Sequence, residues 1–310
     1  MKALIQLLVF YFALMGTAHA QSTLTLPQPA TSSETQTMTS DVKIKNKKFE
    51  DTREITDAKM RADLGSLSRY SFKLDLGYNG PTIGKPLEKD LPNPDNMRRV
   101  NATNIKGNIS GRYRLDSNSA IFLGGGLSAL YPFHGMNRMD VNTPQIGYDM
   151  FHRVGDVQMR NAFGVSFETV PTYQAVGIAG GLNYIGSTLF DLGTSGFTSG
   201  VDLMFFYKVY NRDYQPTDGN TPRYTGILSP SLKYNFSDRA SLSTSLGFAF
   251  WNPRAKDNTT ALVPQTVTQK LSFGYAFKKT VFVSPYLNFY PGKLAMDTTT
   301  VNLSTVFSLL

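Results

Sequence analysis

The strongest constraint in this sequence is an alternation of apolar and polar side chains that begins at Arg69 and continues to the last residue. In the stretch RYSFKLDLGY, residues 69–78, apolar side chains occupy every second position, and Ser71, Lys73 and Asp75 lie between them. Because successive side chains of an extended chain point to opposite faces, a period of two predicts a β-strand with one apolar face. In a soluble sandwich that face would form the core, whereas in a membrane barrel it would meet lipid and the polar face would line the interior.

The lengths of the alternating segments favour the membrane barrel. Most of them run for about ten to thirteen residues, whereas a tilted membrane strand needs about 9–11 and a soluble strand usually has about five or six. The segments are 69–79, 104–115, 120–131, 145–154, 157–169, 174–185, 197–209, 224–236, 242–250, 267–277, 281–290 and 298–310.

The connections between these segments alternate in length. Those at 116–119, 237–239 and 278–280 are tight and polar, and those at 80–103, 132–144, 210–222 and 252–265 are longer and rich in Pro, Asn, Asp and Gly. Short periplasmic turns and longer outer loops are typical of outer-membrane barrels, which in single-chain bacterial proteins have an even number of strands. Segment 145–154 alternates less clearly, but it makes the number even. We therefore expect an all-β, transmembrane, antiparallel up-and-down barrel over residues 69–310, most simply with twelve strands and otherwise with ten or fourteen.

The first 20 residues predict a signal peptide. Lys2 precedes an apolar run from Ala3 to Met15, and Ala18-His19-Ala20 matches an A-x-A cleavage pattern that would release a mature chain near Gln21. The alternative, a membrane anchor or a buried helix, fits less well because the run is short for a bilayer span.

Residues 21–68 predict a periplasmic tail before the first strand. Its first part is rich in Ser, Thr, Gln and Pro, which is typical of disordered segments. Residues 50–64 could form a short helix. We favour a simple lead-in outside the barrel, and the alternative is a plug that enters the barrel from the periplasmic side.

With its signal peptide, alternating strands and alternating loop lengths, the chain resembles Gram-negative outer-membrane β-barrel proteins of the porin-like kind. The resemblance is one of architecture and covers residues 69–310; the last strand alternates as expected but ends in Leu310, where such barrels usually carry an aromatic residue. It implies an outer-membrane location and contact with outer-membrane lipid and lipopolysaccharide. It also implies periplasmic chaperones and the barrel assembly machinery as partners during biogenesis.

Little in the chain predicts catalysis or a cofactor. It has no cysteine, which excludes disulfides and thiolate metal sites, and the predicted mature chain offers only His134 and His152 as histidines. Neither has a clear nucleophile as a partner, and residues 213–219 have too few oxygen donors for a calcium loop. We therefore predict no enzyme, no metal and no cofactor, with an outer-membrane hydrolase as the weakest alternative. The net charge of +8 is spread singly apart from residues 43–48, so no nucleic-acid partner is expected.

The inward face carries the functional prediction. A charge facing lipid is costly, by about 2–4 kcal/mol for Arg or Lys at the midplane, whereas a charge lining a wet lumen sets selectivity. The residues expected to line the lumen and set selectivity are Lys73, Asp75, Lys106, Arg112, Arg114, Arg160, Glu168, Asp202, Lys208, Lys233 and Lys270. Cations predominate among them, and Arg112 and Arg114 could form a short cationic track. We expect a passive diffusion channel for small solutes with a weak preference for anions. The alternative is a closed structural or adhesive barrel whose extracellular loops bind a partner.

Overall fold

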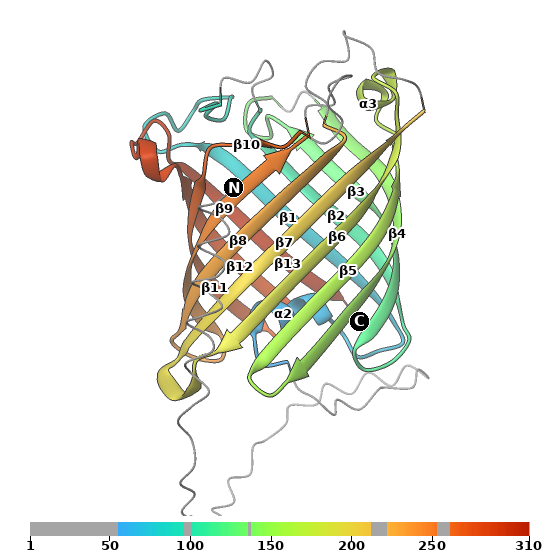
Figure 1. The fold of residues 1–310 in the computed structure, drawn as a ribbon, viewed down its shortest axis with the longest axis vertical. Helices are drawn as coiled ribbons and strands as arrows, with labels where there is room; N and C mark the ends of the chain where they lie inside the picture. Colours follow the sequence, from blue (N-terminus) through green and yellow to red (C-terminus); the bar gives the residue numbers. More distant parts are fainter. Residues whose placement is uncertain (1–54, 96–100, 136–137, 212–221, 253–260, 310) are drawn as a thin grey trace, which may run out of the picture. The chain divides into compact units, whose positions relative to one another are not determined.

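Residues 55–95, 101–135, 138–211, 222–252 and 261–309 are described by a computed structural model, in which the strands form one antiparallel sheet closed into a ring (Figure 1). In chain order the strands are β1 (Tyr70–Thr82), β2 (Asn104–Arg114), β3 (Ser119–Leu130), β4 (Arg138–Val154), β5 (Val157–Phe167), β6 (Ile178–Asp191), β7 (Phe197–Tyr210), β8 (Tyr224–Asn235), β9 (Ala240–Trp251), β10 (Val263–Pro264), β11 (Thr268–Lys278), β12 (Val281–Phe289) and β13 (Thr300–Leu309). The predicted signal peptide and the tail up to residue 54 lie outside the described residues.

β10 extends the barrel wall without adding a strand to it. Its two residues pair with Trp251 and Phe250 at one end of β9, and β11 continues along the same edge of β9 from Thr268, which pairs with Gly247. The other edge of β9 pairs with β8, and this pairing closes the ring. The wall is therefore a closed antiparallel barrel of twelve strands. This confirms the predicted fold class and strand count, and it excludes ten and fourteen.

The period of two appears directly in the exposure of β1. Tyr70 and Phe72 are 56% and 53% exposed, whereas Ser71 and Lys73 are 5% and 4% exposed. The same apolar coat covers other strands, with exposed side chains that include Leu123, Phe163, Leu182, Phe205 and Phe273. The apolar face is therefore the outer surface of the barrel and the polar face its interior, as in barrels that contact lipid.

The two ends of the barrel differ. Connections of two to five residues join the strands at one end, here called the short-turn end, and longer connections join them at the other, the long-loop end. No helix among the described residues is long and apolar enough to cross a bilayer.

The strand predicted at 174–185 begins later than expected. Residues 171–175 form the short helix α3 (Pro171–Ala175), whose first position is a proline, and β6 starts at Ile178. The register of β6 against β7 shifts between Ile178 and Gly180, so Ile178 is buried instead of lying on the outer face as expected. A proline-initiated helix turn and a bulge are local features that override the alternation at this strand end.

A second helix, α2 (Ala58–Leu64), lies inside the barrel near its short-turn end (Figure 1). Asp57 caps its first turn by accepting a hydrogen bond from the Met60 amide at 2.8 Å, and the helix ends at Gly65, whose φ of 75° suits glycine. The preferred interpretation of residues 50–64 as a lead-in outside the barrel is therefore corrected. Residues 55–64 occupy the lumen, and 50–54 lie outside the described residues.

The helix packs against opposite parts of the wall. Ala62 is buried with Ala276, Phe282 and Val306, which belong to β11, β12 and β13. Ile55, Met60 and Leu64 are buried with Phe151 of β4. Because α2 contacts wall strands on both sides, it bridges the lumen instead of lining one side of it.

Candidate channel lumen

A buried cluster of charges ties the end of α2 to the wall. Asp63 of α2 pairs with Lys73 of β1 at 2.6 Å and with Arg160 of β5 at 3.0 Å. Arg160 also reaches Asp149 of β4 at 3.1 Å, and Lys73 reaches Asp75 at 3.3 Å. Charges removed from water are tolerated when each has a partner of opposite sign, and every member of this cluster has one.

The charges around Asp63 control its protonation. Burial alone would raise the pKa of this carboxyl, but the positive charges of Arg160, Lys73 and Lys59 outweigh the burial. The net effect holds the pKa of Asp63 well below its usual value, so the carboxylate stays charged at neutral pH.

Arg112 and Arg114, expected to form a cationic track, instead bind the backbone at the end of α2. Arg112 donates to the carbonyl oxygens of Asp63 and Leu64 at 2.8 and 2.9 Å, and it pairs with Asp149 at 3.2 Å. Arg114 donates to the carbonyl of Leu64 at 2.7 Å and to that of Ser66 at 2.8 Å. Carbonyls at a helix C-terminus have no partners within the helix and carry partial negative charge, which suits these guanidinium groups.

The start of α2 is held by a different part of the wall. Asp57 pairs with Lys233 of β8, and the Gln158 side-chain oxygen accepts hydrogen bonds from the Thr56 and Asp57 amides, each at 3.0 Å. Both ends of the helix are therefore fixed by polar side chains of the wall, some of them far away in the sequence.

The eleven predicted lumen residues fall into three groups. Those around the end of α2 are Lys73, Asp75, Arg112, Arg114 and Arg160; those beside a cavity near its start are Asp202, Lys233 and Lys270; and those toward the long-loop end are Lys106, Glu168 and Lys208. Glu168 lies just beyond the end of β5, where its carboxylate accepts a hydrogen bond from the Val170 amide at 2.9 Å. Its backbone amide still donates to the Ala179 carbonyl at 3.0 Å, next to the start of β6.

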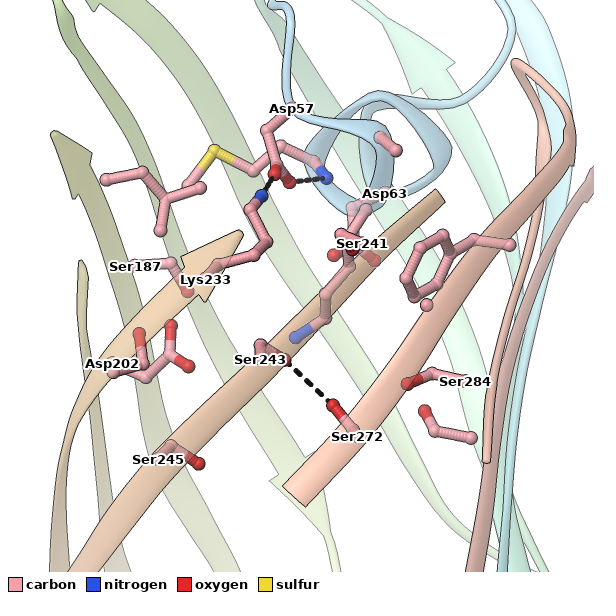
Figure 2. A pocket seen from close by; sticks show the side chains of 18 of the residues that line it. Asp57, Asp63, Ser187, Asp202, Lys233, Ser241, Ser243, Ser245, Ser272 and Ser284 are labelled. Carbon is pink, nitrogen blue, oxygen red and sulfur yellow. Dashed lines mark hydrogen bonds and ion pairs between the residues drawn. The ribbon is translucent and has the colours of Figure 1, made fainter. Parts of the chain in front are cut away.

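Serine side chains surround the cavity beside α2, here called the serine cavity (Figure 2). It has an empty volume of about 950 Å³, counted out to open solvent. The serines are Ser187, Ser231, Ser241, Ser243, Ser245, Ser272, Ser284 and Ser304, contributed by β6, β8, β9, β11, β12 and β13. The interior is thus asymmetric, with charge clusters on β1, β2, β4 and β5 and hydroxyl groups on β8, β9 and β11–β13.

A second cavity opens between α2 and the turn that joins β8 to β9, at the short-turn end. It shares Asp57, Ala58, Lys233 and Ser241 with the serine cavity. The ion pair between Asp57 and Lys233 therefore stands between the serine cavity and this end of the barrel.

Several residues of the lumen were not among those predicted. Asp57 and Asp63 belong to the segment interpreted as a lead-in, so their role depends on the position of α2. Asp149 and Gln158 follow the inward phase of their strands, and that alternation could have identified both. Phe151 shares the phase of Asp149 and is fully buried against α2.

Neither histidine has a side-chain hydrogen bond or ion pair among the described residues. His134 lies in the connection after β3, where its amide donates to the Tyr131 carbonyl at 3.0 Å, and His152 lies on β4 opposite Met159. No group of three or more His, Asp or Glu side chains that could hold a metal ion occurs within the described ranges.

Comparison with known proteins supports the fold. No family model matches the chain, and no curated protein matches its sequence. Among solved structures, the COG4313 outer membrane channel from Pseudomonas putida F1 is 10% identical, with a TM-score of 0.50 over 80% of this chain and 98% of that one. The NanC porin is 6% identical, with a TM-score of 0.43 over 77% of this chain and 98% of that one. Salmonella typhi OmpF, solved with daunomycin, is 8% identical, with a TM-score of 0.37 over 77% and 97%. At these identities the first match shows that the chain shares the fold of an outer-membrane barrel, and the likeness goes no further.

Proposed function

We propose that this chain is a passive outer-membrane channel for small solutes, with a weak preference for anions. The observation that carries the proposal is the serine cavity, because it is polar space inside a closed barrel and not a packed apolar core. Solutes would pass beside α2, along the hydroxyl side of the lumen. Lys270 and Lys59 line this path without a carboxylate within 4.0 Å among the described residues, so their charges would favour anions.

Planar bilayers test this proposal. The purified, folded protein is expected to give discrete current steps, and a potassium chloride gradient is expected to shift the reversal potential toward that of chloride. Replacing Lys270 by Gln removes one cation that has no ion pair within 4.0 Å among the described residues and is expected to reduce this shift. A matched control is Lys278→Gln, at the exposed end of the same strand. A heat-modifiable, folded barrel that never conducts would overturn the proposal.

A closed barrel with a binding role is the second candidate, and the network around α2 favours it. Ion pairs fix both ends of the helix, as expected of an interior filled for stability. The long connection between β1 and β2 would then bind a partner. Deleting it is expected to abolish binding while folding and heat-modifiable gel migration are retained, and unchanged binding would exclude that role.

We also propose the membrane location, the export signal and the biogenesis partners that such a channel requires. The apolar coat would contact outer-membrane lipid, and lipopolysaccharide in the outer leaflet. Residues 1–20 would direct export and be removed near Gln21, and periplasmic chaperones and the assembly machinery would deliver the chain. Mass spectrometry of the mature N-terminus, in cells that export the protein, tests the cleavage site.

A further inference from the structure

The serine cavity combines free hydroxyl groups with unpaired charge. Ser243 and Ser272 bond to each other at 2.8 Å, whereas no hydrogen bond involves the other six serine hydroxyls among the described residues. A hydroxyl group both donates and accepts, so these six can bond to any polar solute that enters. An apolar solute would displace water from them without replacing its hydrogen bonds, which is unfavourable.

The charged side chains that line the serine cavity sum to one net positive charge. Four cations line it, Lys59, Arg160, Lys233 and Lys270, and three carboxylates, Asp57, Asp63 and Asp202. Asp57 and Asp63 are already paired with cations. Among the described residues, the charged groups with no ion pair within 4.0 Å are therefore Lys59, Lys270 and Asp202, and Asp202 attracts Lys270 electrostatically from a greater distance.

Lys270 is held in position by an aromatic ring. Its ammonium nitrogen lies 3.8 Å from the centroid of the Tyr286 ring on the neighbouring strand β12. A contact with the ring face stabilises the charge without using its N–H groups on an anion, so these donors stay available to a solute. Asp202, on β7, can accept hydrogen bonds from solute hydroxyls but opposes a second negative charge.

We propose that the serine cavity is a binding site, along the path of the solute, for small polyhydroxylated monoanions. These are open-chain carboxylates with a hydroxyl group on most carbons. The carboxylate would bind at Lys59 and Lys270, and the hydroxyl groups would bond to the serines and Asp202. This inference rests on the proposed channel function and adds the class of solute that it would favour.

Current block in planar bilayers tests the inference with three probes that separate the effect of the charge from that of the hydroxyl groups. Gluconate carries both a charge and hydroxyl groups, propionate carries only the charge, and sorbitol carries only hydroxyl groups. At constant ionic strength, gluconate is expected to block the chloride current at a concentration at least about ten-fold lower than propionate, which corresponds to one or two hydrogen bonds between neutral hydroxyl groups. Sorbitol is expected to have little effect. Equal block by gluconate and propionate would overturn the inference while leaving the channel function intact.

Variants of the cavity locate the site. Lys270→Gln is expected to weaken gluconate block by about ten-fold, since it removes a charged donor. Ser245→Ala combined with Ser284→Ala is expected to weaken gluconate block but not propionate block. Lys278→Gln is the control and is expected to change neither. If gluconate block is the same in the cavity variants as in the control, the assignment to this cavity is wrong.

A barrel that does not conduct would refute the proposed function but still permits a test of binding. Isothermal titration calorimetry of the folded protein in detergent with the same three probes then shows whether the cavity binds gluconate. Binding of gluconate that Lys270→Gln weakens would support the site, and absence of binding would overturn it.

Discussion

Asp63 connects α2 to two strands of the wall. Its carboxylate pairs with two cations, Lys73 and Arg160, in a buried environment. Replacing it by Asn would leave both cations with one fewer partner each. Breaking a buried ion pair from one side costs about 3–5 kcal/mol, and we expect about 3 because Asp75 and Asp149 remain.

Urea unfolding in lipid vesicles measures this difference in the free energy of unfolding. Asp297→Asn is a suitable control, because Asp297 is exposed in the connection before β13 and is expected to change stability by less than about 0.5 kcal/mol. Equal stability of the two variants would show that the buried cluster does not hold the barrel together.

The same carboxyl makes stability depend on pH in a definite direction. In the unfolded chain an Asp has a pKa of about 3.9, and in the folded protein the pKa of Asp63 is lower. Its contribution is therefore fully present above about pH 4 and is lost as the pH falls from there toward the folded pKa, because the unfolded chain binds the proton first. Urea midpoints are expected to show this decline in the natural protein. Asp63→Asn should lack that part of the decline, whereas Asp297→Asn should keep it.

At the scale of elements, the question is whether α2 moves when solutes pass. If solutes pass through the serine cavity beside it, the helix can stay docked during conduction. The natural chain has no cysteine, so Ala62→Cys and Val306→Cys, which lie in one buried cluster of α2 and β13, can be joined specifically as a disulfide by mild oxidation. The joined protein is expected to conduct as before. Currents that disappear on joining, but not in either single-cysteine variant, would show that α2 must leave its position.

The elements also differ in how far the sequence could predict them. Alternation placed most wall strands to within a few residues, because the contrast between lipid and lumen repeats at every second position. Two strands differ more: β4 starts at Arg138, inside the connection predicted at 132–144, and β6 starts at Ile178, where α3 and a register shift replace the alternation. The position of α2 was not predictable, because Asp57 meets Lys233, 176 residues away. Which inward side chains face each other across a barrel depends on strand number and stagger, and no local pattern records the stagger.

The functions of the inward charges could be predicted only in part, because the sequence does not show which side chains face each other across the barrel. Strand phase gives the face on which a side chain lies, and for Arg112 and Arg114 the structure places that face toward α2. Their donors are used by the carbonyls of the helix, so substituting them is expected to loosen α2 before it changes selectivity. Lys270 and Lys59, by contrast, have no carboxylate within 4.0 Å among the described residues, although Asp202 and Asp63 act on them electrostatically from farther away.

At the scale of the whole molecule, different parts of the wall present different side chains to α2 and to the lumen. The strands β1, β2, β4 and β5 hold the end of α2 through buried charges. The strands β8 and β11–β13 also contact the helix, through Lys233 and a small apolar cluster, and with β9 they contribute most of the hydroxyl groups of the serine cavity beside it. Inside the barrel, Asp57, Asp63 and Asp149 pair with inward lysines and arginines, which leaves few inward cations of the described residues without an ion pair, so only a weak preference for anions is expected.

The last prediction concerns the apolar outer face of the barrel and its contact with the membrane. Ile109, at the centre of β2, and Leu115, just beyond the end of that strand, are 46% and 44% exposed. If the coat contacts lipid, an arginine at the centre of the strand meets hydrocarbon and one at its end reaches water. Ile109→Arg is therefore expected to destabilise the barrel by about 2–4 kcal/mol, and Leu115→Arg by about 1 kcal/mol or less. Urea unfolding in lipid vesicles measures both. Because exposure and residue type are matched, similar losses in the two variants would mean that depth in a bilayer plays no part, and the outer face would then not be a lipid-facing surface.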